Sequence, residues 1–225
     1  WRADIDALPI HETLEVPYKS KNPGVKHACG HDAHTAVGLG IAEVLAGMRA
    51  DIAGTIVFLF QPAEEGPPEG EEGGAPLMIK EGALANPRPQ AIFAYHVSPF
   101  FEAGTIGYRE GPTLASADTF EVKFKGQKAH GSMPHLGNDA VVTAAQCILA
   151  LQTIHSRRVD PSQPTVLTVG TIQGGDRHNV IADNVRVTGT LRTYSESVRE
   201  SIRTMMRQTL TGCTSGFGAT FELNW

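Results

Sequence analysis

Three short apolar stretches in the first hundred residues each run into polar side chains of the kinds that bind metals or move protons. The stretches cover residues 1–8, 55–60 and 91–95, and each predicts a buried strand of an α/β sheet. Between the first two, apolar residues at helical spacing predict a helix over 33–48, which gives a βαβ arrangement. Ligands of open α/β sheets gather beyond the carboxyl ends of the strands. We therefore expect the polar side chains that follow these strands to converge.

The pattern changes in the second half of the chain. It predicts a strand, a helix, two strands, a helix and a strand, over 118–125, 139–155, 165–172, 184–193, 196–210 and 219–225. This β-α-β-β-α-β order is typical of a ferredoxin-like domain, in which two helices cover one face of an antiparallel sheet. Gly111 and Pro112 interrupt the chain before it, so we expect a domain boundary near residue 112.

The predicted fold class is therefore α/β with two domains. Residues 1–112 are expected to form the first part of a catalytic domain with a central, mostly parallel sheet. Residues 113–225 are expected to form the ferredoxin-like domain.

Composition narrows the classes of partner. The chain has 225 residues, 41% of them apolar, and a formal net charge of −5, which fits a globular protein. Dense clusters of Lys and Arg are missing and the apolar runs are far shorter than roughly 20 residues, so neither nucleic acid nor a membrane is an expected partner. Three scattered cysteines are not typical of a disulfide framework and favour a reducing compartment such as the cytoplasm. Small molecules or peptides are the expected partners.

The densest chemical signal lies just before the first predicted helix, where residues 27–34 contain three His, one Cys and one Asp. Thiolate and imidazole groups bind zinc-like metals, and Gly30 allows the backbone to bend so that Cys29 and His31 can face one centre. A capping turn with incidental His is the alternative. The sequence has no second Cys/His pair at zinc-finger distance, so it favours a catalytic metal site.

Two adjacent acids, Glu64 and Glu65, follow the second predicted strand. Such a pair can divide the work of a hydrolytic metal site, with one carboxylate as a ligand and the other as the base that takes a proton from water. Spacing alone does not assign the two roles. The alternative, exposed loop acids, is the expected state of the nearby Glu69, Glu71 and Glu72.

The other two strands contribute further candidates. His96 follows the third predicted strand and is a candidate ligand, unless it is a structural histidine. Asp4 is interpreted as a carboxylate that orients a ligand His, as metal sites usually require. Because Asp6 lies two residues further on and on the same face of the strand, spacing leaves the choice between the two open.

Three motifs in the first half resemble a known family. They are Arg-Ala-Asp-Ile-Asp-Ala-Leu-Pro at 2–9, His-Ala-Cys-Gly-His-Asp-Ala-His at 27–34 and Phe-Gln-Pro-Ala-Glu-Glu-Gly at 60–66. These motifs are similar to those of the N-acyl-amino-acid amidohydrolases, a group that includes hippurate hydrolases and plant indole-acetyl-amino-acid hydrolases. The group belongs to the aminoacylase and carboxypeptidase family of metallopeptidases. Further similar motifs occur at 126–135, 174–175, 179–181 and 189–193, so the resemblance covers essentially the whole chain.

The resemblance implies an enzyme that uses two divalent metal ions to hydrolyse the amide bond of N-acyl amino acids or small peptides. The implied metal ligands are Cys29, His31, Glu65 and His96, with Glu64 as the catalytic base and Asp4 as the supporting carboxylate. A water between the metals would attack the amide carbonyl, and Glu64 would pass the proton of this water to the leaving amine. Zinc suits these ligands best, while manganese, nickel or cobalt are compatible with them.

For residues 113–225 the resemblance implies a lid and dimerisation domain, and hence a homodimer. His130 resembles a lid histidine that reaches the developing oxyanion, usually from the partner subunit. Asn179 and Arg192 resemble residues that hold the substrate carboxylate, with surface or turn-capping roles as the alternative. Supporting or structural roles are expected for the remaining histidines of these motifs, His34, His135 and His178.

Members of this family normally continue at both ends, with a segment before the first strand and another after the lid that brings a final His ligand. That ligand would lie beyond Trp225, so we expect the chain to be part of a longer protein. The stretch 66–74 is longer than is usual in the family and is expected to shape substrate entry. The alternative hypothesis is a truncated remnant that supports dimerisation or ligand binding without catalysis.

Overall fold

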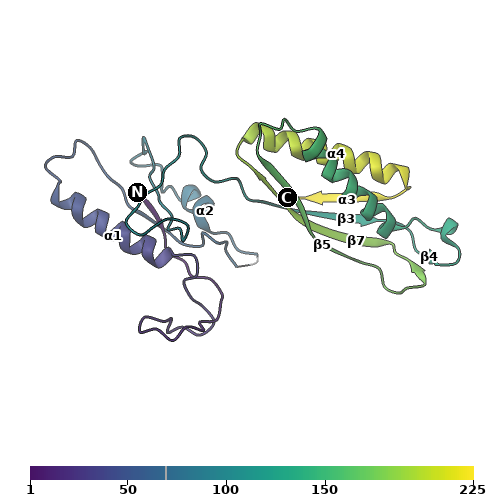
Figure 1. Ribbon diagram of the computed structural model, residues 1–225, viewed down its shortest axis with the longest axis horizontal. Helices are drawn as coiled ribbons and strands as arrows, with labels where there is room; N and C mark the ends of the chain where they lie inside the picture. Colours follow the sequence, from purple (N-terminus) through teal and green to yellow (C-terminus); the bar gives the residue numbers. More distant parts are fainter. Residues whose placement is uncertain (69) are drawn as a thin grey trace. The chain divides into compact units, whose positions relative to one another are not determined.

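The chain divides into two compact units, Trp1–Ile106 (unit 1) and Gly107–Trp225 (unit 2). They are seen in a computed structural model that describes residues 1–68 and 70–225 (Figure 1). Glu69 lies outside the described residues, whereas Glu71 and Glu72 are exposed, as expected. Within the described residues, the helices are too short or too polar to cross a membrane.

Unit 1 begins with the predicted βαβ arrangement. Strand β1 (Arg2–Asp4) pairs in parallel with β2 (Leu59–Gln61), and helix α1 (His31–Gly47) lies between them in the sequence. The helix comes close to the strands because Gly38 has no side chain, since a Cβ there would lie 3.3 Å from the Cβ of Ala3. Both strands are shorter than the apolar stretches that predict them.

The third predicted strand of unit 1, over 91–95, is wrong. The structure assigns no strand to this segment, which is attached to β1 by a backbone hydrogen bond from Arg2 N to Phe93 O at 2.8 Å. An apolar run becomes a strand only where a neighbour pairs with its successive backbone groups. Within the described residues, the parallel sheet of unit 1 therefore consists of β1 and β2.

Helix α2 (Gly74–Lys80) follows the acid-rich stretch and is not predicted by the sequence pattern. Its first turn contains glycine and proline, which usually interrupt helices. Proline is nevertheless compatible with a first helical turn, where its missing N–H would have had no partner inside the helix.

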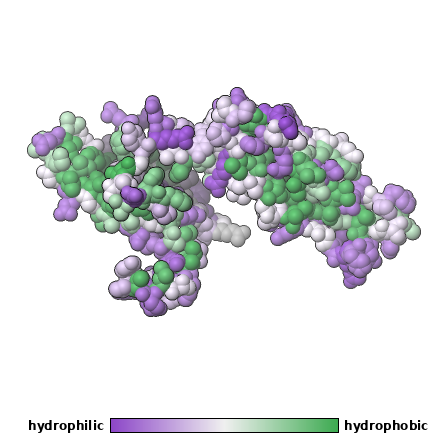
Figure 2. All heavy atoms as spheres, viewed as in Figure 1, coloured by the Kyte–Doolittle hydropathy of each residue, from purple (hydrophilic) through white to green (hydrophobic). Residues whose placement is uncertain are grey.

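Unit 1 buries few apolar side chains. Among the residues that the structure describes, Ala3 is its one buried apolar residue. On α1, Leu39 and Val44 are 57% and 61% exposed, and Figure 2 shows apolar residues at the surface of this unit. The buried side chains are instead mainly polar, namely Asp4, His31, His34 and Gln61.

Unit 2 has the predicted order of principal elements. They are β3 (Asp118–Lys125), α3 (Ala140–Arg157), β5 (Thr165–Gly174), β7 (Asn184–Thr193), α4 (Glu196–Gly216) and β8 (Thr220–Asn224). The strands form one antiparallel sheet in the order β5-β7-β3-β8. In Figure 1, α3 and α4 lie on the same side of this sheet.

The core of unit 2 lies between the sheet and its two helices. Alternate residues of β3, Phe120, Val122 and Phe124, are at most 1% exposed, which is the pattern of a strand with one buried face. Met206 and Leu210 of α4 are fully buried in the same apolar cluster. Contacts of this kind hold the helices against the sheet.

Three short elements lie at one end of unit 2 and are not predicted by the sequence pattern. Strand β4 (Ala129–His130) pairs antiparallel with β6 (Val180–Ile181), and a 3-10 helix, η1 (Pro134–Leu136), follows β4. Strands of two residues are too short to show an alternating pattern. Their pairing brings together two motifs that are well separated in the sequence.

Candidate metal centre

Four segments of unit 1 bring metal-binding side chains together. They are the end of β1, the turn before α1, the turn after β2 and the segment around residue 96. Three overlapping groups have potential ligand atoms within 4.8 Å of one another: Cys29, His31 and His96; His31, Glu64 and Glu65; and Asp4, His31 and His34. The structure therefore gathers all four ligands that the sequence suggests, with His31 common to every group.

The turn before α1 positions Cys29 and His31. Gly30 precedes the helix with a φ of 89°, in the left-handed region that favours glycine. A Cβ on this residue would lie 2.2 Å from the Cγ2 atom of Val97. Glycine at this position therefore allows the turn to approach the segment that carries His96.

His31 has one occupied ring nitrogen and one free one. Its Nδ1 atom lies 3.0 Å from Asp6 Oδ1 and 3.1 Å from Asp6 O, which are both acceptors. In the neutral ring the proton is thus on Nδ1, and Nε2 carries the lone pair. Nε2 is buried, and within the described part of the chain it has no hydrogen-bond partner. Its neighbours are Glu64 Oε2 at 3.7 Å and Glu65 Oε1 at 3.9 Å.

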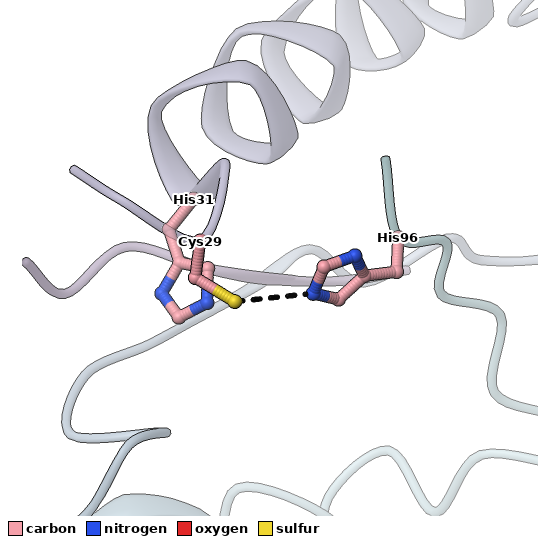
Figure 3. A group of neighbouring side chains, drawn as sticks. All are labelled: Cys29, His31 and His96. Atoms are coloured by element: carbon pink, nitrogen blue, oxygen red, sulfur yellow. Dashed lines mark hydrogen bonds between the residues drawn. The ribbon is translucent and has the colours of Figure 1, made fainter. Parts of the chain in front are cut away.

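In His96, as in His31, Nδ1 carries the proton of the neutral ring and Nε2 carries the lone pair. Nδ1 lies 2.6 Å from the carbonyl oxygen of Val97, so it carries the proton of the neutral ring. Nε2 lies 3.5 Å from Cys29 Sγ, and Figure 3 shows the sulfur directed toward this nitrogen, with His31 beside it. Two imidazole lone pairs and one thiol therefore face a common space.

The turn after β2 presents the two carboxylates. Ala63 has a φ of 49°, an uncommon conformation for a residue other than glycine, directly before Glu64. The Glu65 N–H donates to Asp6 Oδ2 at 3.1 Å. Asp6 therefore contacts His31 with one carboxylate oxygen and the turn of Glu65 with the other.

The charges around this space favour a cation. Burial and the neighbouring Glu65 and Glu64 raise the pKa of Cys29 to about 11, so the thiol is protonated when no cation is bound. Burial would raise the pKa of Asp6, but hydrogen bonds from the backbone of Glu65 and Glu64 outweigh it and lower that pKa overall. A divalent cation would reverse the situation of the thiol and displace its proton.

Asp4 and His34 form a neighbouring pair whose polar atoms are already used. Asp4 Oδ1 lies 2.5 Å from His34 Nδ1, and Asp4 Oδ2 accepts from Arg2 Nη1 at 2.6 Å. The remaining ring nitrogen, His34 Nε2, accepts from the backbone N–H of Val97 at 3.0 Å. His34 therefore has no free lone pair for a metal, although its position is close enough.

The two aspartates of β1 and its extension thus contact different histidines. Asp6 holds His31, whereas Asp4 holds His34 and lies 3.9 Å from His31 Nε2. Asp4 therefore has its hydrogen bond with His34, and its expected role in orienting a ligand His stays a prediction. Strand periodicity predicts that both carboxylates lie on one face. It does not predict which imidazole each carboxylate contacts, because that depends on where the histidines lie in the fold.

The residues present fit a divalent metal of the zinc type. Such ions take imidazole nitrogen, thiolate sulfur and carboxylate oxygen, and all three donor types occur here. The buried and unpartnered His31 Nε2 is the strongest single indication, because a buried polar atom without a partner is costly unless something binds it.

Unit 2 brings together two of its three candidate residues. His130 of β4 is paired with Val180, and the Gly131 N–H donates to Asn179 O at 2.8 Å. The Ser132 N–H donates to His130 Nδ1 at 3.2 Å, so the proton of the neutral His130 ring is on Nε2. His130 thus offers an exposed N–H donor beside Asn179.

Arg192 lies on β7 of the four-stranded sheet, toward the end of that strand far from β4 and β6. Arg192 follows Leu191, which pairs with Asp118 at the start of β3. β4 comes after the end of β3 and β6 comes before the start of β7, so both are close in sequence to the other end of these paired strands. The separation along β7 is roughly 25 Å at about 3.3 Å per residue. Arg192 lines a groove of about 780 Å³ together with Tyr194 and the loop after α3. The other two histidines of the motifs, His135 and His178, are exposed.

A buried imidazole lone pair that faces carboxylates and a thiol is characteristic of a hydrolytic metal site. Residues 1–214 match the Peptidase family M20/M25/M40, and the chain belongs to this family. The family agrees with the resemblance that the sequence motifs indicate, while the roles of the individual residues in the cluster stay predictions.

Curated relatives and solved structures agree with this assignment. The chain is 42% identical over 224 residues to an N-acetyl-L-cysteine deacetylase of Bacillus subtilis, covering 100% of this chain and 52% of the relative. It is also 42% identical over 224 residues to an N-acyl-L-amino acid amidohydrolase of Geobacillus stearothermophilus, with 100% and 59% covered. Bacillus subtilis YXEP, a dinuclear metal-binding M20 peptidase, is 38% identical with a TM-score of 0.80, covering 100% of this chain and 55% of that structure.

The chain therefore spans little more than half the length of these relatives. Sequence reasoning identified the cluster but missed the contact of Asp6 with His31 and Glu65, and the role of Ser132 beside His130. The available signals were the i, i+2 spacing of Asp4 and Asp6 and a hydroxyl residue two positions after His130.

Proposed function

We propose that the chain carries the metal-binding part of a dinuclear metal-dependent amidohydrolase that cleaves N-acyl amino acids or small peptides. The observation that carries the proposal is the buried Nε2 lone pair of His31, which faces Glu64 and Glu65 and has no partner among the described residues. The names of the relatives from Bacillus subtilis and Geobacillus stearothermophilus support an N-acyl amino acid as the substrate.

In this proposal Cys29, His31, Glu65 and His96 hold two divalent ions. Zinc is the best match because the set includes a thiol and two imidazoles, and manganese, nickel or cobalt are compatible with it. When bound, the ions would polarise the amide carbonyl and increase the acidity of the attacking water. Asp6 would hold His31 in the tautomer that leaves Nε2 free.

Glu64 is the proposed general base. Its Oε2 atom lies 3.7 Å from His31 Nε2, and its side chain is 39% exposed, so it can reach both the metal side of the site and an incoming substrate. Glu64 Oε2 would accept a proton from water and then deliver it to the nitrogen of the leaving amine. Arg2 Nη2 lies 3.9 Å from Glu64 Oε1 on the side of β1.

Unit 2 is proposed to be the lid and dimerisation domain. The His130 Nε2–H would donate to the developing oxyanion, and Asn179 and Arg192 would hold the substrate carboxylate. Because Arg192 is roughly 25 Å from the His130 end of the sheet at about 3.3 Å per residue, one copy of unit 2 cannot place all three on one small substrate. We therefore propose a homodimer in which the partner subunit completes the site.

The proposal is tested with the full-length protein by metal analysis and by hydrolysis of hippurate and N-acetyl amino acids. Close to two equivalents of metal per chain, with turnover that chelation abolishes and added zinc or manganese restores, are expected. Absence of both metal and turnover would overturn the proposal. Bound metal without turnover on any N-acyl amino acid or dipeptide would instead support the non-catalytic alternative.

A further inference from the structure

We infer that His34 is a positioning residue for His96: its imidazole, held by Asp4, fixes the backbone of Val97 and thereby the orientation of the His96 ring. This inference rests on the proposed metal site, because it concerns the placement of one of the proposed ligands. His34 itself has no free lone pair and is not a ligand.

The segment that carries His96 has little support from regular structure. Residues 91–98, all within the described part of the chain, belong to no strand or helix. The backbone contact with β1 is made at Phe93, three residues before the ligand. A metal ligand must be held to within about 0.5 Å of its working position. Contacts closer to His96 must therefore provide this precision. Before the ligand, the Tyr95 hydroxyl donates to Ala33 O at 3.2 Å, and a second contact is needed after it.

His34 provides such a contact from the first turn of α1. It is 1% exposed, and Nδ1 donates to Asp4 Oδ1 at 2.5 Å. Nε2 accepts the backbone N–H of Val97 at 3.0 Å, so the ring links β1 to the residue that follows the ligand. The centroids of the His34 and His96 rings are 4.5 Å apart with an interplanar angle of 69°, which gives a direct edge contact between the rings.

Fixing Val97 also fixes the tautomer of His96. The carbonyl oxygen of Val97 lies 2.6 Å from His96 Nδ1, which keeps the proton on Nδ1 and the lone pair on Nε2, 3.5 Å from Cys29 Sγ. The side chain of Val97 also packs against Gly30, where a Cβ would come within 2.2 Å of Val97 Cγ2. Val97 therefore contacts two residues of the motif that also contains Cys29, and the ligand is aligned through it.

Two amide variants of His34, each of which reproduces one ring-nitrogen position, separate this role from a general structural one. In His34→Gln the amide reaches the position of Nε2 and can accept the Val97 N–H, whereas in His34→Asn the amide reaches only the position of Nδ1 and contacts Asp4 alone. The full-length variants and a His96→Ala control are assayed for zinc affinity by competition with a chelating dye. We expect His34→Asn to bind zinc at least about tenfold more weakly and His34→Gln to recover most of this loss.

The outcomes distinguish the inference from the proposed function. If His96→Ala loses affinity while His34→Asn and His34→Gln both bind like the unmodified protein, the positioning role is wrong and the metal site stands. If His96→Ala binds zinc unchanged, the proposed ligand set is wrong. A measurement without variants is the ¹⁵N spectrum of the His34 ring, which should show Nδ1 protonated and Nε2 unprotonated; the opposite tautomer would overturn the inference.

Discussion

The two units bury different kinds of side chain. Unit 2 fills the space between its sheet and its helices with apolar residues such as Phe120, Leu151 and Met206. Unit 1 buries Asp4, His31 and His34, while apolar residues of α1 such as Leu39 stay exposed. In unit 2 burial excludes water from an apolar core, whereas in unit 1 it aligns polar groups around a space that is suited to a cation.

Stability and the proposed metal chemistry therefore depend on different groups of residues. Removing apolar area from water is the main favourable term in folding, so unit 2 has the means to fold on its own core. Buried polar groups are costly unless they are paired, and the unpartnered Nε2 of His31 leaves that cost partly unmet without a ligand. Substitutions in the polar cluster of unit 1 should therefore change metal binding and catalysis, and those in the apolar core of unit 2 should change the free energy of unfolding.

The largest expected effect comes from Glu64→Gln. The amide keeps the size of the side chain but cannot accept the proton of the attacking water, so we expect kcat to fall by about 10²–10⁴-fold. Because Glu64 is not a proposed ligand, metal content and the unfolding temperature should stay unchanged. Steady-state kinetics measures kcat, elemental analysis measures the metal content and thermal unfolding measures the unfolding temperature. Loss of metal in this variant would mean that Glu64 and Glu65 exchange roles.

The second-largest effect is expected in unit 2, on stability and not on metal binding. Met206→Ala removes a fully buried side chain from the apolar core and should lower the free energy of unfolding by about 2–5 kcal/mol. Leu149→Ala is the control, since Leu149 on α3 is 64% exposed and its truncation should change stability little. Urea unfolding followed by circular dichroism measures the difference. A parallel loss of bound metal would contradict the separation of roles between the units.

The elements of unit 2 could be predicted because their patterns record burial on one face. Phe120, Val122 and Phe124 alternate with polar residues along β3, and the predicted bounds of this strand agree with the structure. The end of α4 was placed too early, near Leu210, because the following residues are Thr, Gly and Cys. The helix continues to Gly216, where Thr214 is buried and its hydroxyl donates to Leu210 O.

In unit 1, the sequence predicted the candidate site residues better than it predicted the strands. Residue type drew attention to Cys29, His31 and the pair Glu64 and Glu65, because thiol, imidazole and carboxylate groups are the usual ligands of zinc-like metals. Only the family resemblance chose Glu65 as the ligand of that pair. The strand predicted over 91–95 was wrong because an apolar run does not reveal whether a pairing partner exists. The allocation of Asp6 to His31 depends on distances across the fold, which periodicity cannot supply.

A third, smaller effect is expected from Asp6→Asn. Asp6 accepts hydrogen bonds from both His31 Nδ1 and the Glu65 N–H, and an amide can accept at only one of these places. At the other place the amide NH2 group would face the N–H of His31 or Glu65, and two donors repel each other. We therefore expect metal affinity to fall about 10–100-fold. Asp51→Asn on the exposed surface is the matched control. Equal affinities for both variants, measured by competition with a chelator, would show that Asp6 does not align the ligands.

The smallest effect concerns a polar contact of unit 2 that serves stability rather than chemistry. Asp118 accepts hydrogen bonds from Arg199, including one from Nε at 2.9 Å, and these lower the pKa of Asp118. A lowered pKa means that the stabilisation is present above the pKa of the unfolded chain and is lost as the pH falls through the folded-state value. Asp118→Asn should cost about 1–3 kcal/mol at neutral pH, and this cost should shrink in acid.

Urea unfolding of the unmodified protein and of Asp118→Asn, at pH 7 and at lower pH values, tests this pH dependence. Glu222→Gln is a suitable control because Glu222 and its partner Lys125 are both about half exposed, and such surface pairs contribute less than about 1 kcal/mol. A difference between the Asp118→Asn variant and the unmodified protein that is independent of pH would mean that the contact acts through packing. The metal content should be the same in all three proteins, because the polar contacts of unit 2 hold its fold and those of unit 1 hold its ligands.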